Sequence, residues 1–335
     1  QFSQTPTIPF HMHAVVMHDR GAAEVLRYET VPTPRAHGDE VLLRVEGATV
    51  NHTDIFHRTG QFFIQKPLPH ILGMDVAGTV SAVGARVKHF HGGERVVATF
   101  EGLGRERDGG YAQYTVVPES ELHVIPNGLD VHAAASIGLA FTTAWLALVE
   151  TARLSNGDRL LVQGAASGVG TSAIQIARHA GAQVIAVAKP EKADRLTTLG
   201  AHLVLPMDTA HLPRMVKDAT EGRGVTHVLD LVGRDTLATS ISCLAEGGTV
   251  LCAGALSGDL ARINVMELML CRGHLQGIYG KLSPGSFETI LDRFAQGVYQ
   301  PVIDRVMPLR DAQEAHRLVE NREVLGKIVL DPWRR

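Results

Sequence analysis

The chain has 335 residues, of which 45% are hydrophobic and 20% are charged, and its formal net charge is −3. This composition is that of a globular protein, and the length predicts two domains. No basic stripe is present, which excludes nucleic acid as a main partner, and no apolar run reaches the roughly 18 residues of a membrane-spanning helix. The three cysteines form no CxxC pair, which excludes a disulfide framework and a four-cysteine zinc lobe.

The first part of the chain has the texture of β-structure. Residues 1–11 are polar and without pattern, so we expect them to be an extension outside the fold. From Met12 to about Ile125, short apolar runs such as Val41–Leu43 are separated by glycine, proline and aspartate, which predicts a compact β-rich barrel. A single helix is predicted over Ala133–Ala152, where Gly138 is the only glycine and proline is absent.

The second part alternates strands with helices. Strands are predicted at Arg159–Val162, Gln183–Ala188, His202–Leu205, Thr226–Leu231 and Thr249–Ala253, with helices at Val169–Ala180 and Glu191–Leu199. This alternation predicts an α/β domain with a doubly wound parallel sheet. A helix at Asp311–Asn321 and a strand at Lys327–Leu330 do not continue it, and we expect them to return to the first domain. The predicted domains are 134–299 and a discontinuous one of 12–133 and 300–335.

A small-residue turn follows the first predicted strand of the second domain. The strand Leu160–Val162 leads into Gly164-Ala165-Ala166-Ser167-Gly168-Val169-Gly170 and then directly into a helix. In the GxGxxG register, Ala165 and Ser167 replace the first two glycines, so the motif is degenerate. Its place between strand and helix nevertheless predicts dinucleotide binding, because the helix N-terminus attracts a pyrophosphate. The predicted cofactor-binding residues are Ala166, Ser167, Gly168, Val169 and Gly170, together with Gly254 and Tyr279.

The end of the second strand bears on the choice of cofactor. An acidic residue there is typical of NAD binding, but this chain has Ala188 followed by Lys189, Glu191 and Lys192. Lys189 and Lys192 favour the 2′-phosphate of NADPH. Two alternatives remain open: the lysines lie on a solvated first helical turn, or Glu191 contacts the adenosine ribose of NAD.

These motifs together resemble the medium-chain dehydrogenase/reductase superfamily and, within it, the zinc-free quinone oxidoreductases related to ζ-crystallin. The resemblance runs from Met12 to Leu330. It is carried by Asn51-His52-Thr53-Asp54 with Arg58 and Gly60, Leu72–Gly78, Phe141–Trp145, the small-residue turn, Asp230–Gly233 and Gly326–Leu330. It implies a Rossmann domain and a discontinuous GroES-like β-barrel domain, with the active site in the cleft between them. It also implies a cytoplasmic homodimer or homotetramer.

The superfamily's zinc alcohol dehydrogenases hold their catalytic metal with a cysteine, a histidine and a second cysteine or acidic residue. The matching positions here are Asn51, Met74 and Leu139, none of which is a competent zinc ligand in this setting. The short segment Glu101–Gly110 stands where those enzymes carry a cysteine-rich structural loop. We therefore predict no metal site and hydride transfer to quinones or α,β-unsaturated carbonyls, which spread the incoming charge themselves.

The resemblance assigns roles to individual residues. Asn51, Thr142 and Asp54 are the predicted catalytic residues: Asn51 as a hydrogen-bond donor to a substrate carbonyl, and Thr142 near the nicotinamide. Their alternative interpretations are a turn residue, a helix-internal hydroxyl and a structural carboxylate. Arg58 is predicted either to contact substrate or to form a buried ion pair with Asp54 that fixes the helix.

Two phenylalanines replace tyrosines that are often found in quinone oxidoreductases. Phe56 and Phe62 cannot donate a proton, and we expect them to form an apolar wall for the substrate. Protonation would then come from solvent, or from His52, Thr53 or His57. Three other functions stay open: a zinc-type alcohol dehydrogenase with substitute ligands from His52, Asp54, His57 and His70, an enoyl-thioester reductase, and an NADPH-binding protein with low turnover.

Overall fold

The computed structural model describes residues 7–62, 66–98 and 101–335. The chain forms two compact units: unit 1 is Gln1–Leu139 with Glu288–Arg335, and unit 2 is Ala140–Phe287. Unit 1 is therefore discontinuous in sequence. Its limits lie at 139/140 and 287/288, whereas the sequence places them at 133/134 and 299/300.

Unit 1 is built on two sheets. A seven-stranded sheet has the order β15-β16-β3-β5-β6-β8, with β7 also paired to β3, and a three-stranded sheet has the order β2-β1-β4. The strands are β1 (His11–Met17), β2 (Leu26–Pro32), β3 (Glu40–Thr49), β4 (His70–Ile71), β5 (Asp75–Val83), β6 (Arg95–Ala98), β7 (Tyr114–Pro118), β8 (Leu122–Val124), β15 (Ile303–Pro308) and β16 (Lys327–Asp331). All neighbouring strands except β15 and β16 are antiparallel, as the β-barrel prediction requires.

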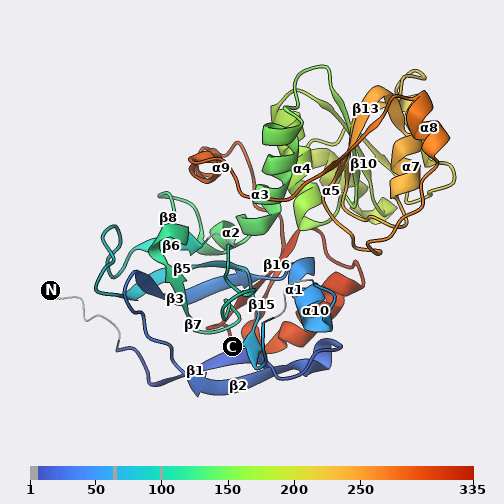
Figure 1. Ribbon diagram of the computed structural model, residues 1–335. Helices are drawn as coiled ribbons and strands as arrows, with labels where there is room; N and C mark the ends of the chain where they lie inside the picture. The colour runs from blue at the N-terminus through green and yellow to red at the C-terminus, as the bar shows by residue number, and fades with distance from the viewer. Residues whose placement is uncertain (1–6, 63–65, 99–100) are drawn as a thin grey trace. The chain divides into compact units, whose positions relative to one another are not determined.

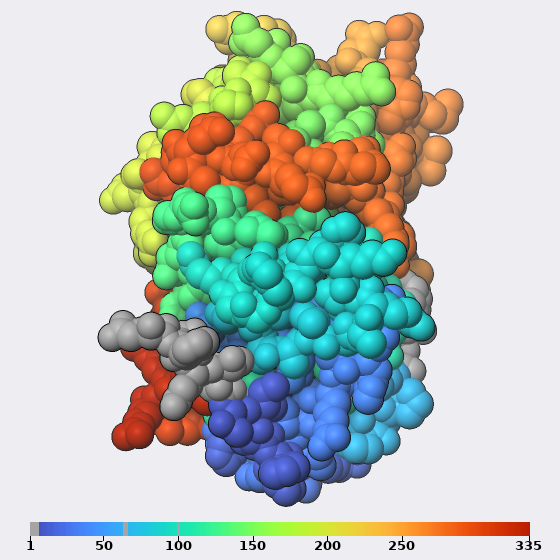
Figure 2. Space-filling model, turned by 90° about the vertical axis from the view of Figure 1, so that its left-hand side faces the viewer, coloured from blue at the N-terminus to red at the C-terminus, as the bar shows by residue number. Residues whose placement is uncertain are grey.

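The N- and C-terminal segments meet inside unit 1. β16 pairs with β3, and helix α10 (Ala312–Glu320) packs against helix α1 (His52–Thr59). Figure 2 shows the red C-terminal residues in the same part of the molecule as the blue N-terminal strands. The core is apolar, and β3 lies at its centre with Val41, Leu43 and Val45 fully buried. The last segment of the chain thus lies in the same unit as the first.

Unit 2 is a parallel sheet covered by helices. The strand order is β11-β10-β9-β12-β13-β14, and every neighbouring pair is parallel. The strands are β9 (Arg159–Gln163), β10 (Gln183–Val187), β11 (Leu203–Leu205), β12 (Val225–Asp230), β13 (Leu244–Cys252) and β14 (His274–Gly277). The helices are α4 (Gly168–His179), α5 (Ala193–Leu199), α6 (Leu212–Ala219), α7 (Leu237–Ser242) and α8 (Val265–Leu270). Figure 1 shows α4 and α5 on one side of the sheet and α7 and α8 on the other, which confirms the doubly wound fold.

The predicted helix Ala133–Ala152 is wrong as a single element. The structure has α2 (Val131–Ala135), α3 (Gly138–Trp145) and a π-helical turn over Leu146–Thr151. The break has a physical cause in β5, because the Asp75 Oδ1 oxygen accepts the backbone N–H of Leu139 at 2.8 Å. A carboxylate held there satisfies one of the free N–H groups at the start of a helix, so α3 begins anew at that point. Helix α9 (Ser286–Ala295) follows later in the chain.

Two smaller observations concern the ends of the predicted elements. The fold begins before Met12, because His11 already pairs with Pro32 in the first sheet and the Phe10 carbonyl accepts the N–H of Thr33. Of the expected extension 1–11, residues 1–6 lie outside the described residues.

Within the part of the chain that is described, no helix is long and apolar enough to cross a membrane.

Candidate active site

The predicted cofactor residues gather at one edge of the unit 2 sheet. Because β9, β10, β13 and β14 are parallel, their carboxyl ends lie at the same edge. The small-residue turn follows β9, Lys189 follows β10, Gly254 follows β13 and Tyr279 follows β14. The structure therefore brings together residues that are more than a hundred positions apart in the sequence. Their contact with a cofactor stays a prediction.

The turn itself has the shape that a dinucleotide requires. The Ser167 hydroxyl donates to the Gly164 carbonyl at 2.8 Å and accepts the Gly170 N–H at 3.0 Å, which caps α4. A Cβ atom on Gly170 would lie 2.5 Å from the Gly164 carbonyl oxygen, so only glycine lets the helix begin this close to the strand. Gly168 and Val169 remain partly exposed, and their N–H groups belong to the unbonded first turn of the helix. This arrangement fits a pyrophosphate group.

The residues after β10 form a short 3-10 helix, Pro190–Lys192, that leads into α5. Ala188 is buried, Lys189 and Lys192 are half-buried, and Glu191 is exposed. Both lysines thus follow the carboxyl end of β10, which lies beside β9 and its small-residue turn. A ribose phosphate bound there would need a positive charge nearby. Tyr279 is 77% exposed.

Thr142 has an unusual environment for a helical threonine. It lies in α3 and is 4% exposed, and its hydroxyl has no hydrogen-bond partner among the described residues. A helical threonine commonly bonds the carbonyl one turn earlier, and an unpaired buried hydroxyl costs about 1–3 kcal/mol. The hydroxyl is therefore available to a ligand, which favours the functional interpretation of Thr142 over the helix-internal one.

In unit 1, Asn51 lies in a buried polar cluster at the start of α1. Its Nδ2 donates to Asp75 Oδ2 at 2.8 Å, and its Oδ1 accepts from the Lys327 ammonium. Thr49 also donates to Asp75 Oδ2 at 2.8 Å, and Lys327 Nζ lies 3.6 Å from that oxygen and donates to the Val50 carbonyl. Asn51 is 8% exposed, whereas Asp75 is fully buried. We call Thr49, Asn51, Asp75 and Lys327 the Asp75 cluster.

Asp54 lies beside this cluster. One carboxyl oxygen accepts the Asn51 N–H at 2.9 Å and the other accepts the Gly73 N–H at 3.0 Å. Burial raises the pKa of Asp54 to about 7, and the nearby Asp75 charge adds to that increase. Asp54 is fully buried and both oxygens bond to backbone, which fits a carboxyl that joins α1 to the Gly73 loop. Its catalytic role stays a prediction.

The expected ion pair between Asp54 and Arg58 is wrong. Arg58 is 1% exposed, and its guanidinium forms two hydrogen bonds with Glu320, at 2.6 and 3.0 Å. It also contacts His316 Nδ1 at 3.0 Å, and His316 Nε2 lies 2.9 Å from the Tyr111 hydroxyl. Asp54 bonds to backbone instead, because it faces the start of α1 while Arg58 faces α10. This enclosure disfavours substrate contact by Arg58.

The aromatic residues and histidines in and just after α1 are half-buried or buried. Phe56 and Phe62 are half-buried, and the Phe62 ring lies 4.3 Å from the ring of His57. Burial lowers the pKa of His57 to about 4, and burial with the nearby Lys327 charge lowers the pKa of His52 to about 4. Both imidazoles are therefore neutral at pH 7, which makes them weak proton donors.

The three positions that match zinc ligands surround Asp75. Asn51 bonds its side chain, Leu139 bonds it through the backbone, and Met74 precedes it in the chain. An amide, a thioether and an alkyl side chain do not make a zinc site. Among the described residues, no three His, Cys, Asp or Glu side chains come together to hold a metal ion. The substitute-ligand alternative therefore lacks a donor set in this part of the chain.

Sequence reasoning missed Asp75, Lys327 and Thr49 as site residues. Asp75 and Lys327 do stand in motifs that carry the family resemblance, Leu72–Gly78 and Gly326–Leu330, but nothing in those motifs indicates that they meet. The sequence around Lys327 did hold one indication of this contact. A lysine at the start of an apolar β-strand is buried with the strand, and a buried ammonium requires a polar partner.

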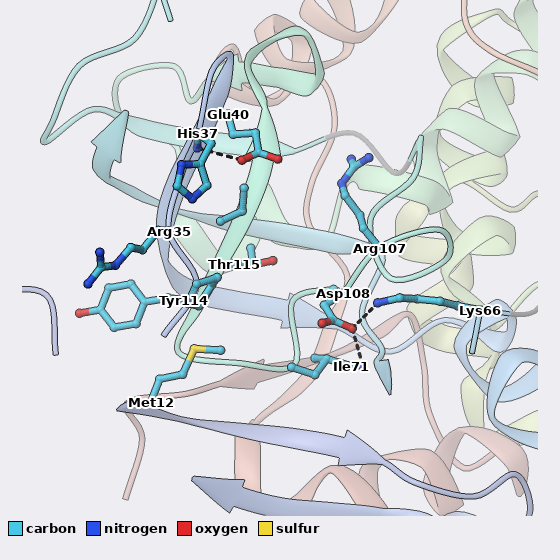
Figure 3. A pocket seen from close by; sticks show the side chains of 13 residues that line it. Met12, Arg35, His37, Glu40, Lys66, Ile71, Arg107, Asp108, Tyr114 and Thr115 are labelled. Atoms are coloured by element: carbon cyan, nitrogen blue, oxygen red, sulfur yellow. Dashed lines mark hydrogen bonds and ion pairs between the residues drawn. The ribbon is translucent and has the colours of Figure 1, made fainter. Parts of the chain in front are cut away.

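A separate cavity of about 400 Å³ opens in unit 1. Figure 3 shows Lys66 directed at Asp108 on the cavity wall, and the Glu40 carboxylate accepting a hydrogen bond from the His37 N–H. Met12 and Ile71 form apolar lining. It is lined by none of the predicted site residues. Of its charged groups, Lys66 pairs with Asp108 and Arg107 pairs with Glu121, and we assign this cavity no part in the candidate site.

Comparisons with known proteins match both parts of the chain. Residues 37–127 match the alcohol dehydrogenase GroES-like domain model and residues 168–296 match the zinc-binding dehydrogenase model. A 2-haloacrylate reductase from Burkholderia sp is 32% identical over 95% of this chain and 98% of its own length. The quinone oxidoreductase of Sus scrofa is 30% identical over 95% of this chain and 97% of its own.

Solved structures give the same result. An NAD-dependent alcohol dehydrogenase is 36% identical and superposes with a TM-score of 0.90, covering 96% of this chain and 99% of its own. A mycobacterial protein complexed with NADPH is 31% identical with a TM-score of 0.85, covering 96% of this chain and 100% of its own. The chain belongs to the medium-chain dehydrogenase/reductase superfamily of oxidoreductases and is homologous to the quinone oxidoreductases.

Proposed function

We propose that this protein is an NADPH-dependent reductase that transfers hydride to quinones or α,β-unsaturated carbonyls without zinc. The observation that carries the proposal is the composition of the Asp75 cluster: an amide donor stands where the zinc enzymes have a metal ligand. The relatives named above include a 2-haloacrylate reductase and a quinone oxidoreductase. A haloacrylate is an alkene conjugated to a carboxyl group, so both names fit acceptors that take up hydride without a Lewis acid.

Unit 2 is the part of the chain proposed to hold the cofactor. The N–H groups of Gly168 and Val169 would bind its pyrophosphate, and Lys189 and Lys192 its 2′-phosphate. The unpaired Thr142 hydroxyl is proposed to bond the carboxamide of the nicotinamide. When bound, the cofactor supplies the hydride; these residues bind and orient it.

Unit 1 is the part proposed to bind the acceptor. Asn51 has two amide N–H groups, one of which donates to Asp75, and the other has no acceptor among the described residues. This second N–H is proposed to donate to the substrate carbonyl oxygen and to stabilise the charge that develops on it. Phe56 and Phe62 supply apolar surface for the rest of the substrate. Because His52 and His57 are neutral, the final proton is proposed to come from water.

We also propose a homodimer or homotetramer, in which a second copy of the chain covers the edge strand β14. All four residues of β14 are exposed, and α8 presents Val265, Met266, Met269 and Leu270 at 60–77% exposure. Unpaired strand edges and apolar patches of this kind are typical of association sites. Sedimentation of a Met269→Glu, Leu270→Glu variant should show loss of the oligomer, while Val124→Glu, at an exposed site in unit 1, should not.

One experiment tests the proposed reaction. Oxidation of NADPH by the purified protein is followed with a panel of quinones, enones and acrylates, with saturated ketones and alcohols with NADP⁺ as controls. Turnover restricted to the conjugated acceptors, and unaffected by a zinc chelator, is the expected result. Turnover of simple alcohols that the chelator abolishes would replace the proposal with a zinc-type dehydrogenase. Tight NADPH binding without turnover would favour the binding protein, and turnover of enoyl thioesters alone would favour the thioester reductase.

A further inference from the structure

Lys327 is a buried lysine whose ammonium is held by neighbouring oxygens. Its ammonium lies near three oxygens: the Val50 carbonyl at 3.1 Å, the Asn51 side-chain carbonyl, and Asp75 Oδ2 at 3.6 Å. It is 5% exposed. Two of the three N–H donors of this ammonium form hydrogen bonds, to Val50 and Asn51, and its charge also pairs with Asp75. Because these contacts hold the ammonium against Asn51 and Asp75, we expect Lys327 to act through a neighbour.

That neighbour is Asn51. The two ends of a carboxamide have nearly the same shape, and only their hydrogen bonds decide which way the group faces. Here the oxygen end receives a cationic donor and one N–H of the nitrogen end meets an anionic acceptor. Lys327 and Asp75 thus fix the amide from both ends. A flipped Asn51 would place its N–H groups against Lys327 and its oxygen against the carboxylate, and both contacts would be repulsive.

The same contacts polarise the amide. An ammonium on the carbonyl oxygen draws electron density from the nitrogen, which strengthens the remaining N–H as a donor. That N–H belongs to an 8% exposed residue in a cluster where Thr49 and Asp75 are fully buried, so Asn51 is the member of the cluster nearest to the surface. A fixed, strengthened donor is what a developing oxyanion requires.

We propose that Lys327 is a positioning residue for the reduction, which locks and polarises the Asn51 amide so that its free N–H points to the substrate carbonyl. The inference rests on the proposed function for its kinetic consequence. The locking of Asn51 itself does not depend on which substrate the protein reduces.

The first experiment reads the lock directly, without turnover. The chain has five asparagines, so protein labelled with ¹⁵N at asparagine gives five side-chain amide pairs, and Asn51→Ala identifies the pair of Asn51. Lys327→Met should shift both Asn51 amide signals and speed their exchange with solvent. The control Lys66→Met removes a lysine that pairs with Asp108 elsewhere in unit 1, and it should leave the Asn51 signals in place.

The second experiment measures kinetics on the same variants. Lys327→Met should lower kcat for the conjugated acceptor about 10- to 100-fold, as expected for one charge-assisted hydrogen bond, with KM for NADPH within about twofold of its original value. Lys327→Gln keeps an N–H donor and should recover part of kcat; it also serves if Lys327→Met does not fold. The double variant Asn51→Ala, Lys327→Met should be no slower than Asn51→Ala alone.

The outcomes separate the inference from the proposed function. An inactive unaltered protein with shifted Asn51 signals in Lys327→Met rejects the proposed function and keeps the lock. An active protein in which Lys327→Met leaves the Asn51 signals or kcat unchanged rejects the inference and keeps the function. Losses that multiply in the double variant also overturn it, because a residue that acts through Asn51 has no effect once Asn51 is gone.

Discussion

The two units bury polar groups of different kinds. Among the described residues, the buried acidic and basic side chains (Asp, Glu, His, Lys and Arg) of unit 1 are Asp54, His57, Arg58, His70, Asp75, Glu121, His316 and Lys327, whereas unit 2 buries only Asp230. The hydrogen-bond partners of Asp230 are local. Its carboxylate oxygens accept hydrogen bonds from N–H and hydroxyl groups of residues no more than ten positions away, such as the Ser240 hydroxyl at 2.6 Å. In unit 1 the pairs are distant, with 262 positions between Arg58 and Glu320.

This difference separates two ways to build a site. Unit 2 presents backbone N–H groups from one continuous segment, so its chemistry needs little charge in the interior. Unit 1 assembles charges from both ends of the chain, and its polar groups depend on the whole unit being folded. Unit 1 should therefore be more sensitive than unit 2 to the loss of one charge and to pH.

The largest expected effect is the loss of Arg58. Arg58→Met leaves Glu320 and His316 without their partner and should lower the free energy of unfolding by about 3 kcal/mol. Arg317→Met, on α10 like Glu320, removes an exposed pair with Glu24 and should destabilise the protein much less, because solvent screens that pair. Urea denaturation of both variants measures the difference. Equal losses would mean that burial adds nothing to the Arg58 pair.

Acid should destabilise unit 1 first. Burial lowers the pKa of His316 to about 3 and that of His57 to about 4, both from 6.5, so the unfolded chain binds more protons below pH 6.5. Each histidine then loses roughly 1 kcal/mol of stabilisation per pH unit as the pH falls toward 4. Burial also lowers the pKa of His52 to about 4, so three histidines act in this sense. Asp54, whose pKa is raised to about 7, acts in the opposite sense over the same range, but one carboxyl offsets only part of the loss, and a net destabilisation remains at pH 4.

The two tryptophans report the units separately, since Trp333 lies in unit 1 and Trp145 in unit 2. Fluorescence of Trp145→Phe and Trp333→Phe variants, followed during thermal unfolding at pH 7 and pH 4, should show a larger acid-induced decrease in Tm for the Trp333 signal. A larger decrease for the Trp145 signal would reverse the comparison.

A glycine change tests unit 2. Gly170→Ala places a Cβ 2.5 Å from the Gly164 carbonyl oxygen, and overpacking of this kind costs about 2 kcal/mol. We expect the loss to appear in NADPH affinity as well as in stability, because the helix start has to move. Gly92→Ala, where the nearest atom is 4.0 Å away, is the matched control. Calorimetric titration with NADPH measures the affinity of both variants. Unchanged affinity in Gly170→Ala would remove the turn from the cofactor site.

The smallest effect concerns the choice of cofactor. Lys189→Ala with Lys192→Ala should weaken NADPH binding about tenfold, or roughly 1.4 kcal/mol, with NADH binding nearly unchanged, because only NADPH carries the 2′-phosphate. Titrations of both nucleotides decide the matter. Equal weakening of NADPH and NADH would favour the alternative in which the lysines are solvated and Glu191 contacts the ribose.

The sequence predicted those parts of the fold that depend on patterns of residues adjacent in the chain. The doubly wound sheet and the small-residue turn each follow from neighbouring residues, as do the places of Ser167 and Gly170. The Asp75 cluster could not be predicted in that way, because Asn51 and Lys327 are 276 positions apart and nothing local indicates their contact. The same carboxylate explains the error in the long helix, since Asp75 caps α3 from 64 positions upstream. Long-range polar contacts were the common cause.

The position of Lys327 also limits what this scaffold can become. Placing Cys, His and Cys at positions 51, 74 and 139 would recreate the ligand types of the zinc enzymes around Asp75. The new metal would then share its surroundings with an ammonium that already contacts position 51. Two cations so close in a buried site repel each other strongly. We therefore expect that engineering metal catalysis into this scaffold would also call for a fourth substitution, at Lys327.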